Sequence, residues 1–410
     1  MTALTQEVTP EEACLDPVRL ERLERHLQRY VDSERRMGTV IAITRGGKVA
    51  YVNTIGHRDV AAGLPAETDT IWRIYSMTKP ITSVAAMMLH DEGALSLNDP
   101  VAKYIPPFAD ARIYRFGPGT APLTVPAQRP MTVWNLLTHT AGLTYGFMDG
   151  NPVGEAYRMA GFNIAEPEAY TLEEACNRLA TLPLLFEPGT QWNYSHATDV
   201  LARVVEVVSG KSIEEFFTEQ IFQPLKMADS GYVIDEAAAP RLATLYSLDL
   251  RSGKVVPTPG ADSPRTEPRS FHGGGHGLVS TVADYHRFTQ MLLRKGELDG
   301  VRLLSPRTVD LMVANHLPGG ADIASFGRPS PMTENYAGRG FGLGVAPLLD
   351  PVAAKSLSSK GEYTWGGAAG TAFWVDPAED LTVLFFTQVL FAMDELSNEL
   401  RRLVYQALVV

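Results

Sequence analysis

Cysteine is scarce in this chain of 410 residues, which contains only Cys14 and Cys176. The two residues lie far apart and show no metal-ligand spacing, so the sequence predicts neither a disulfide framework nor a zinc site. Both are expected to be unpaired thiols, with Cys176 inside a helix.

Clusters of positive charge are also lacking. The formal net charge is −11, and a phosphate backbone or an anionic membrane surface would repel the protein unless basic residues were gathered in one patch. No such patch is visible in the sequence. Nucleic acid and membranes are therefore not expected as partners, and the oligomeric state stays open.

No apolar run is long enough to cross a membrane. The longest, from Leu381 to Met393, is interrupted by Thr387 and Gln388 and is better explained as a buried strand. Residues 1–15 contain three glutamates and no apolar stretch after a basic start. This pattern predicts no secretory signal and a cytoplasmic location.

The N-terminal part carries signals for a helix followed by a hairpin. Asp16 and Pro17 provide a cap and a first-turn proline for an amphipathic helix that runs to about Arg36. Two β-rich segments, 39–45 and 48–53, meet at Gly46-Gly47, a pair suited to the positive φ angles of a tight turn. A sheet is therefore expected to begin near the N-terminus.

The C-terminal part has signals for further strands and a closing helix. Strands are predicted at 341–346, 361–365, 371–375 and 381–388, with strands returning only in this part of the chain. A terminal helix is predicted from a cap at Asp394, with Leu396, Leu400, Leu403 and Ala407 on its apolar face. Residues 257–269 are the most loop-like segment.

This order of elements predicts an α/β (α+β) fold, with one antiparallel sheet built from both chain ends, flanked by helices, and a mostly helical inserted domain. The predicted boundaries are 1–80 together with 270–410 for the sheet domain and 81–269 for the helical domain. An active-site cleft is expected between the two.

Ser76 and Lys79 form a possible nucleophile and base. They are three residues apart where a β-rich segment turns into a helix, so both would lie on one face near the helix N-terminus. A serine hydroxyl needs a neighbour that takes its proton, and a lysine can do so when burial keeps its amine neutral. The alternative is a helix cap followed by a solvated lysine.

Tyr194 is the candidate for a second proton carrier. It follows the Pro188-Gly189 turn and precedes a helix in the run Trp192 to His196. A phenol beside a lysine ammonium would have its phenolate favoured, so it could accept the serine proton or return one to a leaving group. The alternative is an ordinary half-buried tyrosine.

A third motif, Trp365-Gly366-Gly367-Ala368, ends a predicted strand, and its small residues would let a substrate lie along the backbone. In this order and at these separations the three motifs resemble the class C β-lactamases, the penicillin-binding proteins and, most closely, the family VIII carboxylesterases. The segments 136–143 and 273–281 support the resemblance. It implies a β-lactamase-like fold.

The resemblance also implies roles for individual residues. Ser76 would be the nucleophile, Lys79 and Tyr194 the acid-base pair, and the backbone amides of Ser76 and Ala368 the oxyanion hole. No Gly-x-Ser-x-Gly elbow occurs in the chain, which argues against the α/β-hydrolase route to the same chemistry.

Two departures from the family pattern bear on the substrate. Trp365 stands where the antibiotic-processing enzymes have a lysine or histidine for a carboxylate, so an indole at the pocket mouth favours neutral esters. His196 stands in place of an asparagine and either contacts substrate or is a structural residue bonded to a carbonyl.

Tyr145 either lines the pocket or packs, and His139 is expected to be structural. The glycines 273–277 are expected to pack closely beside the site.

The sequence thus predicts a cofactor-free serine esterase that hydrolyses short- to medium-chain carboxylic esters through an acyl-enzyme on Ser76. Its partner would be a small-molecule ester, with no metal. The alternatives are β-lactamase or D-amino-acid peptidase activity, acyl transfer on the same fold, or a catalytically silent binding protein.

Overall fold

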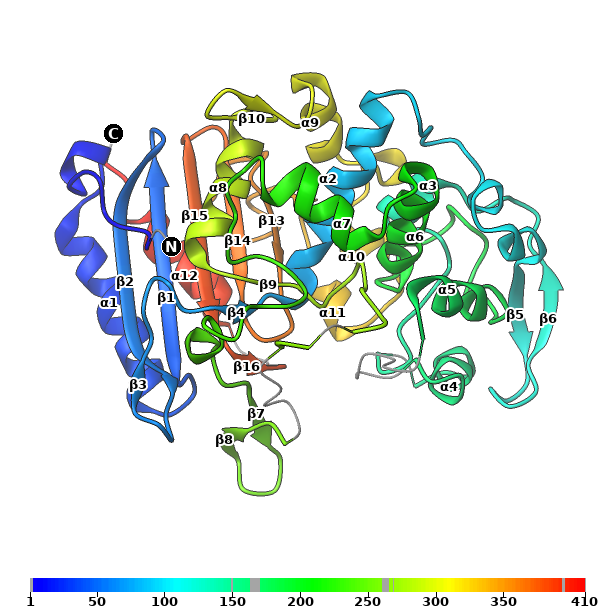
Figure 1. Cartoon of the computed structure of the whole chain (residues 1–410), viewed down its shortest axis with the longest axis horizontal. Helices are drawn as coiled ribbons and strands as arrows, with labels where there is room; N and C mark the ends of the chain where they lie inside the picture. Colours follow the sequence, from blue (N-terminus) through cyan, green and yellow to red (C-terminus); the bar gives the residue numbers. More distant parts are fainter. Residues whose placement is uncertain are drawn as a thin grey trace.

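The computed structural model describes residues 3–148, 150–162, 170–259, 265–267, 269–392 and 395–409. Within these residues the largest sheet has seven strands in the order β12-β13-β14-β15-β1-β2-β3, and every neighbouring pair is antiparallel (Figure 1). The strands are β1 (Gly38–Arg45), β2 (Lys48–Asp59), β3 (Leu64–Pro65), β12 (Ala346–Pro347), β13 (Tyr363–Gly366), β14 (Ala372–Asp376) and β15 (Leu381–Thr387). The predicted antiparallel sheet from both chain ends is confirmed.

The centre of the sheet is where the two ends of the chain meet. Gly46 and Gly47, with φ angles of 60° and 73°, turn β1 into β2 as predicted. The other edge of β1 pairs with β15 in a register that sets Ile41 against Phe385. Strands from the first and last parts of the sequence thereby become neighbours.

Both faces of this sheet are buried, because helices cover each of them. In β1, Ile41 and Ile43 point to one apolar cluster, whereas Val40 and Ala42 point to the other. The first cluster contains α1 (Pro17–Asp32) and α12 (Leu396–Tyr405), and the second contains α8 (Val282–Leu293), which crosses the opposite face (Figure 1). Burial on both faces explains why the strands are apolar throughout rather than alternating.

Both terminal helices were predicted. Asp16 caps α1 by accepting a hydrogen bond from the Arg19 amide at 3.1 Å, although the helix ends at Asp32 rather than near Arg36. The expected cap of α12 at Asp394, like Met393, lies outside the described residues. Cys14 and Cys176 are both free thiols, as predicted.

The remaining helices gather on the other side of the molecule, drawn from light blue through cyan and green to yellow in Figure 1. They are α2 (Thr78–Asp91), α3 (Val133–Leu137), α4 (Pro152–Met159), α5 (Leu172–Ala180), α6 (Ala197–Ser209) and α7 (Ile213–Phe217), and α9 (Pro306–Val313), α10 (Ile323–Phe326) and α11 (Pro331–Glu334) follow later in the chain. Short 3-10 turns occur at Glu11–Ala13, Tyr75–Met77, Val101–Lys103, Pro106–Asp110, Ala239–Arg241 and Pro318–Gly320, and a π turn at Thr218–Phe222.

Strands are not confined to the ends of the chain, and that part of the prediction is wrong. The central region contains hairpins β5 (Arg112–Phe116) with β6 (Leu123–Pro126) and β7 (Tyr246–Asp249) with β8 (Lys254–Pro257). Shorter pairs are β4 (Trp72–Arg73) with β9 (Val279–Ser280), β10 (Glu297–Leu298) with β11 (Val301–Arg302), and β16 (Val389–Leu390) with β7. The division at residues 80 and 270 into two domains stays a prediction.

The strand predicted at 341–346 is reduced to its last residue, where β12 begins. Glycines interrupt it: a Cβ at Gly342 would lie 2.2 Å from the Met312 carbonyl oxygen, and one at Gly344 would lie 2.1 Å from Ser83 Oγ. Gly344 also has a φ of 93°. These residues are apolar because they pack backbone against α2 and α9, not because they form a strand.

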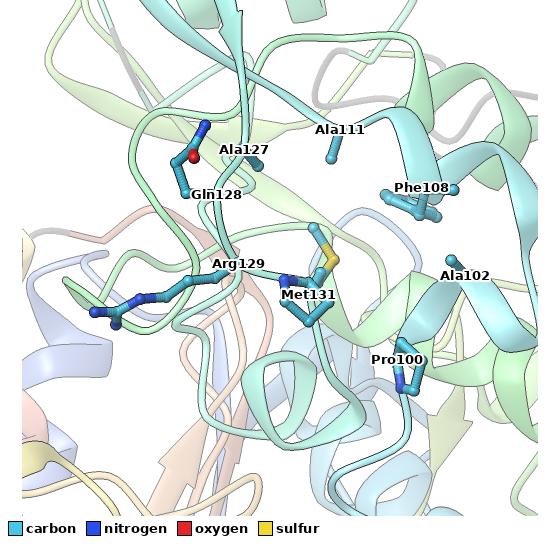
Figure 2. Close-up of a pocket in the computed structure, with 10 residues that line it drawn as sticks. Pro100, Ala102, Phe108, Ala111, Ala127, Gln128, Arg129 and Met131 are labelled. Atoms are coloured by element: carbon cyan, nitrogen blue, oxygen red, sulfur yellow. The ribbon is translucent and has the colours of Figure 1, made fainter.

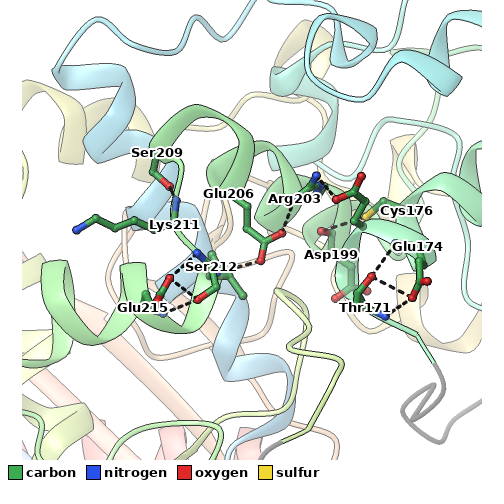
Figure 3. Close-up of polar contacts among 12 residues, drawn as sticks. Thr171, Glu174, Cys176, Asp199, Arg203, Glu206, Ser209, Lys211, Ser212 and Glu215 are labelled. Carbon is green, nitrogen blue, oxygen red and sulfur yellow. Dashed lines mark hydrogen bonds and ion pairs between the residues drawn. The ribbon is translucent and has the colours of Figure 1, made fainter.

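Helix α6, which begins directly after the predicted Tyr194 motif, is held by well-capped neighbours. Thr171 and Glu174 form a capping box on α5, and Ser212 and Glu215 form another on α7 (Figure 3). Between them, Arg203 of α6 contacts the Glu206 carboxylate at 3.0 Å. The described residues contain no helix long and apolar enough to traverse a lipid bilayer.

Candidate active site

Ser76 lies in a 3-10 turn, Tyr75–Met77, immediately before α2. The preceding residue, Tyr75, has a φ of 45°, an uncommon conformation for a residue with a side chain and one that costs free energy. Lys79 follows in the first turn of α2 with 2% of its surface exposed, and its Nζ lies 3.3 Å from Ser76 Oγ. The structure therefore brings the predicted nucleophile and base together, and it excludes the alternative of a solvated lysine.

Lys79 is surrounded by aromatic rings and backbone rather than by a directly bonded carboxylate. Its Nζ donates a hydrogen bond to the Gly275 carbonyl at 2.7 Å and lies 4.6 Å and 5.5 Å from the ring centres of Tyr194 and Tyr145. Burial lowers the pKa of Lys79 to about 7, although the nearby Asp199 carboxylate opposes this shift. A large fraction of the amine is then neutral near pH 7 and able to accept a proton.

Tyr194 is 8% exposed and packs against Lys79 on one side and His139 on the other, with ring centres 4.9 Å apart in the latter pair. The expected favouring of its phenolate is wrong, because burial raises the pKa of Tyr194 above its ordinary value. The side chains of Ser76 and Trp365 are close enough to its hydroxyl to oppose that shift, but they do not outweigh burial. Tyr194 is thus a neutral phenol that carries its proton.

His139 makes a hydrogen bond between its Nδ1 and Ser195 Oγ at 3.3 Å, and burial lowers its pKa well below the ordinary value. The neutral ring packs beneath Tyr194 and Phe341. These contacts fit the structural role predicted for it.

The hairpin between β13 and β14 approaches the turn of Ser76 at Gly367. A Cβ on this glycine would lie 2.4 Å from the Ile74 carbonyl oxygen, and Thr371 Oγ1 donates to that same oxygen at 3.4 Å. The next residue is Ala368. In the part of the chain that the structure describes, neither the Ser76 amide nor the Ala368 amide has a protein acceptor. Two such free donors beside a nucleophile could receive a developing oxyanion.

Trp365 was expected at the pocket mouth, but its indole is only 4% exposed. It packs 5.4 Å from the Tyr194 ring centre and edge-on against Phe341 at 5.3 Å. Trp365 therefore forms part of the wall that covers Tyr194. The indole lies in the interior because β13 is buried on both faces.

His196 packs against Tyr145, with the two ring centres 4.3 Å apart. Its Nδ1 is 2.8 Å from Asp199 Oδ2, so the predicted structural partner, a carbonyl, is wrong. Its Nε2 is buried without a hydrogen-bond partner among the described residues, close to Phe162. Burial lowers the pKa of His196, which leaves the imidazole neutral despite the carboxylate.

Asp199 is the residue that sequence reasoning missed. It sits in the first turn of α6 with 1% of its surface exposed. Burial alone would raise the pKa of this carboxyl, but the hydrogen bond from His196 and the electrostatic interactions with its neighbours, Lys79 among them, together hold it well below its usual range. An ionised carboxylate therefore lies near Lys79 without contacting it directly. Its spacing of three residues after His196 was the available signal.

The glycines 273–277 pack closely beside the site, as predicted. A Cβ on Gly274 would lie 2.4 Å from the Thr198 carbonyl oxygen, and one on Gly275 would lie 3.2 Å from Lys79 Nζ. The backbone can approach α2 and α6 because these side chains are missing.

Above Tyr145, two aromatic side chains reach the surface. The Phe147 ring centre lies 5.1 Å from Tyr145 and 6.2 Å from Phe391, and the two phenylalanines are 38% and 43% exposed. The Phe391 amide donates to the Ala368 carbonyl at 2.8 Å. The pair, called here the aromatic rim, joins the Tyr145 side of the site to the Ala368 side.

A surface pocket of about 180 Å³ lies elsewhere, on the helical side of the molecule (Figure 2). Phe108, Ala127, Gln128 and Met131 are among its lining residues, and none of the predicted site residues lines it. Its lining residues include no serine, cysteine, threonine or lysine that could act as a nucleophile. Within the described residues no group of three or more histidine, cysteine, aspartate or glutamate side chains could hold a metal ion.

Comparison with known proteins matches residues 23–406 to the β-lactamase family model. Esterase EstB of Burkholderia gladioli is 32% identical over 389 residues, covering 90% of both chains, and protein Rv1367c of Mycobacterium tuberculosis is 38% identical over 359 residues, covering 86% of this chain and 85% of the relative. The solved structure of EstCE1, described as a hydrolase with promiscuous acyltransferase activity, superposes with a TM-score of 0.80 at 28% identity, covering 94% of this chain and 98% of that one.

Proposed function

The chain belongs to the β-lactamase family, as its resemblance to the family VIII esterases indicated, and on that premise we propose that it is a serine carboxylesterase acting through an acyl-enzyme on Ser76. Short- to medium-chain esters of neutral character are the proposed substrates. The observation that carries the proposal is the contact of 3.3 Å between Ser76 Oγ and a buried Lys79 whose pKa is about 7. The fold and the esterase relatives support it.

The proposed reaction begins when Ser76 Oγ attacks the ester carbonyl carbon and its proton passes to the neutral Lys79 amine. The carbonyl oxygen becomes an oxyanion, and the amides of Ser76 and Ala368 would donate to it. Tyr194, held as a neutral phenol, gives its proton to the leaving alkoxide and regains one from Lys79. Water then attacks the acyl carbonyl by the same steps in reverse, which frees the acid and Ser76.

A neutral and partly apolar substrate is proposed for two reasons. The site already contains the buried negative charge of Asp199, which would repel a substrate carboxylate, and Trp365, buried in the wall beside Tyr194, supplies no cation to bind one. At the surface, the aromatic rim of Phe147 and Phe391 offers apolar area that an acyl or alcohol group could cover. The bound acyl or alcohol group would lie beside Trp365, Gly366 and Gly367. Tyr145 would form the inner end of its binding site.

The proposal is tested by measuring hydrolysis of p-nitrophenyl acetate and butyrate beside nitrocefin, for the wild type and for Ser76→Ala. We expect the esters to be hydrolysed faster than nitrocefin and the activity to vanish in the variant, with its circular dichroism unchanged. Faster turnover of nitrocefin would favour a β-lactamase or D-amino-acid peptidase. Failure of the wild type both to hydrolyse and to be acylated would favour a silent binding protein.

Acyl transfer is a second candidate because EstCE1, whose fold this chain shares, is described as having promiscuous acyltransferase activity. A bound alcohol would then compete with water for the same acyl-enzyme. Product analysis with p-nitrophenyl butyrate and a mixture of alcohols separates the two outcomes. Butyric acid as the main product supports the esterase, whereas a butyrate ester as the main product supports acyl transfer.

A further inference from the structure

Each oxygen of the Asp199 carboxylate has a hydrogen-bond partner. Its Oδ1 accepts a hydrogen bond from the Gly275 amide at 2.7 Å, and its Oδ2 lies 2.8 Å from His196 Nδ1. Because an ionised carboxylate can only accept, the imidazole donates from Nδ1. The main chain is anchored as well, since the Asp199 carbonyl accepts a weak hydrogen bond from Cys176 Sγ at 3.7 Å (Figure 3).

The Gly275 peptide continues this chain of contacts toward the nucleophile. Its carbonyl accepts the Lys79 Nζ hydrogen bond at 2.7 Å, and Lys79 in turn reaches Ser76 Oγ at 3.3 Å. A Cβ on Gly275 would lie 3.1 Å from both Asp199 Oδ1 and Tyr145 Oη. Asp199 and Lys79 are thus bridged by one glycine residue at which a side chain would be crowded.

We propose that Asp199 is a positioning residue: by accepting the Gly275 amide, it holds the Gly275 carbonyl against Lys79. Its negative charge then acts on the lysine across this glycine. A direct ion pair would keep Lys79 protonated, whereas loss of the carboxylate would remove the anchor of Gly275, whose carbonyl orients the amine. With Gly275 between them, the Asp199 charge acts on Lys79 from a greater distance than in a direct ion pair. This inference rests on the proposed function, because it assigns Asp199 a part in preparing the base of that reaction.

The charged and titratable groups near Lys79 set the sign of the expected effect. They are Tyr145 and Tyr194 at its end, Asp199 on α6, and the imidazoles of His139 and His196. Among these the carboxylate of Asp199 is the group that raises the pKa of Lys79, against the larger effect of burial. Removing its charge must therefore lower the pKa of Lys79 further.

The test compares Asp199→Asn with the wild type and with Asp284→Asn. The amide introduced by Asp199→Asn keeps an acceptor for the Gly275 N–H but loses the charge, whereas Asp284 is a matched control: a buried aspartate in the first turn of α8 that accepts the Asp229 amide at 2.7 Å. In kcat/KM for p-nitrophenyl butyrate we expect the acid limb to move down by about half a pH unit or more in Asp199→Asn. The limb should stay in place in Asp284→Asn.

A readout without turnover separates this inference from the proposed function. The ¹³Cε resonance of Lys79, assigned by its loss in Lys79→Met, should titrate at lower pH in Asp199→Asn than in the wild type, whether or not the protein hydrolyses esters. If Asp199→Asn does not fold, Asp199→Ser carries the same test, since its smaller side chain leaves room for a water. An unchanged Lys79 titration in a folded variant at position 199 would overturn the proposal.

Discussion

Two clusters of buried charge in this protein differ in how their cations are paired. Beneath the sheet, Arg339 and Arg401 both contact the Glu362 carboxylate, at 2.8 Å and 3.6 Å, and Arg401 also donates to Thr364 Oγ1 at 2.7 Å. At the candidate active site, no carboxylate of the described residues is in direct contact with Lys79, and Asp199 lies beyond the Gly275 bridge. The first cluster joins α12 to the sheet, whereas the second keeps a reactive amine.

The different residue types follow from this difference in pairing. Burial lowers the pKa of Arg401 below its ordinary value, but a guanidinium stays protonated in proteins, so its positive charge must be matched by Glu362. Burial lowers the pKa of Lys79 to about 7, and a lysine can then release its proton. Arginine suits a permanent ion pair and lysine suits a proton carrier. The comparison predicts that one cluster governs stability and the other governs rate.

The largest effect is expected from Lys79→Met. Loss of the base should lower kcat/KM for p-nitrophenyl butyrate by about a hundredfold to ten-thousandfold. The free energy of unfolding should not fall together with kcat/KM, because the wild type buries an ionisable amine whereas methionine has no charge to bury. Wild-type Lys79 binds its proton less tightly when folded, with a pKa of about 7 against an ordinary 10.5, so wild-type stability should rise between these pH values. Lys79→Met should lack that rise in denaturant titrations, and near-normal turnover would remove Lys79 from the mechanism.

The opposite pattern is expected from Glu362→Gln. Its side chain is fully buried, and neutralising it leaves Arg339 and Arg401 without their anion, so the free energy of unfolding should fall by about 3 kcal/mol. Guanidinium denaturation measures this loss. The kcat/KM of the remaining folded protein should stay within about twofold of the wild type, since the cluster touches no proposed catalytic group. A large loss of turnover with unchanged stability would contradict the claim that this cluster governs stability rather than rate.

The smallest effect is expected from Tyr145→Phe. The Lys79 amine lies 5.5 Å from the centre of this ring, so the ring itself, which phenylalanine keeps, provides the contact. We expect kcat/KM to change by less than about threefold. Tyr194→Phe is the matched comparison, because it removes the proposed proton donor and should cost at least about a hundredfold. Equal losses in the two variants would mean that the Tyr145 hydroxyl takes part in the reaction.

Local spacing was enough to predict the parts of the site that lie close together in sequence. Ser76 and Lys79 are one helical turn apart, and the Gly46-Gly47 hairpin follows from the φ angles that glycine permits. The sheet was predicted because its strands at both chain ends are apolar. What the sequence could not give was the chain of contacts from Asp199 to Gly275 to Lys79, because its members are separated by long stretches of sequence.

The errors have a common physical cause, which is packing between distant segments. Trp365 was assigned to the pocket mouth from its motif, but burial of β13 on both faces carried its indole inside. The phenolate expected of Tyr194 depended on the lysine charge alone, whereas burial dominates its pKa. The strand expected at 341–346 failed because Gly342 and Gly344 pack backbone against neighbouring helices.

The claim that a partly neutral Lys79 activates Ser76 is tested most directly by the pH dependence of covalent labelling. Diethyl p-nitrophenyl phosphate transfers its diethylphosphoryl group to an activated serine and releases p-nitrophenolate, and intact-mass spectrometry follows the adduct. The account predicts a single adduct, absent in Ser76→Ala, whose rate of formation rises up to about pH 7 and then levels off. A rate that keeps rising to pH 9 without levelling, or equal labelling of Ser76→Ala, would contradict it.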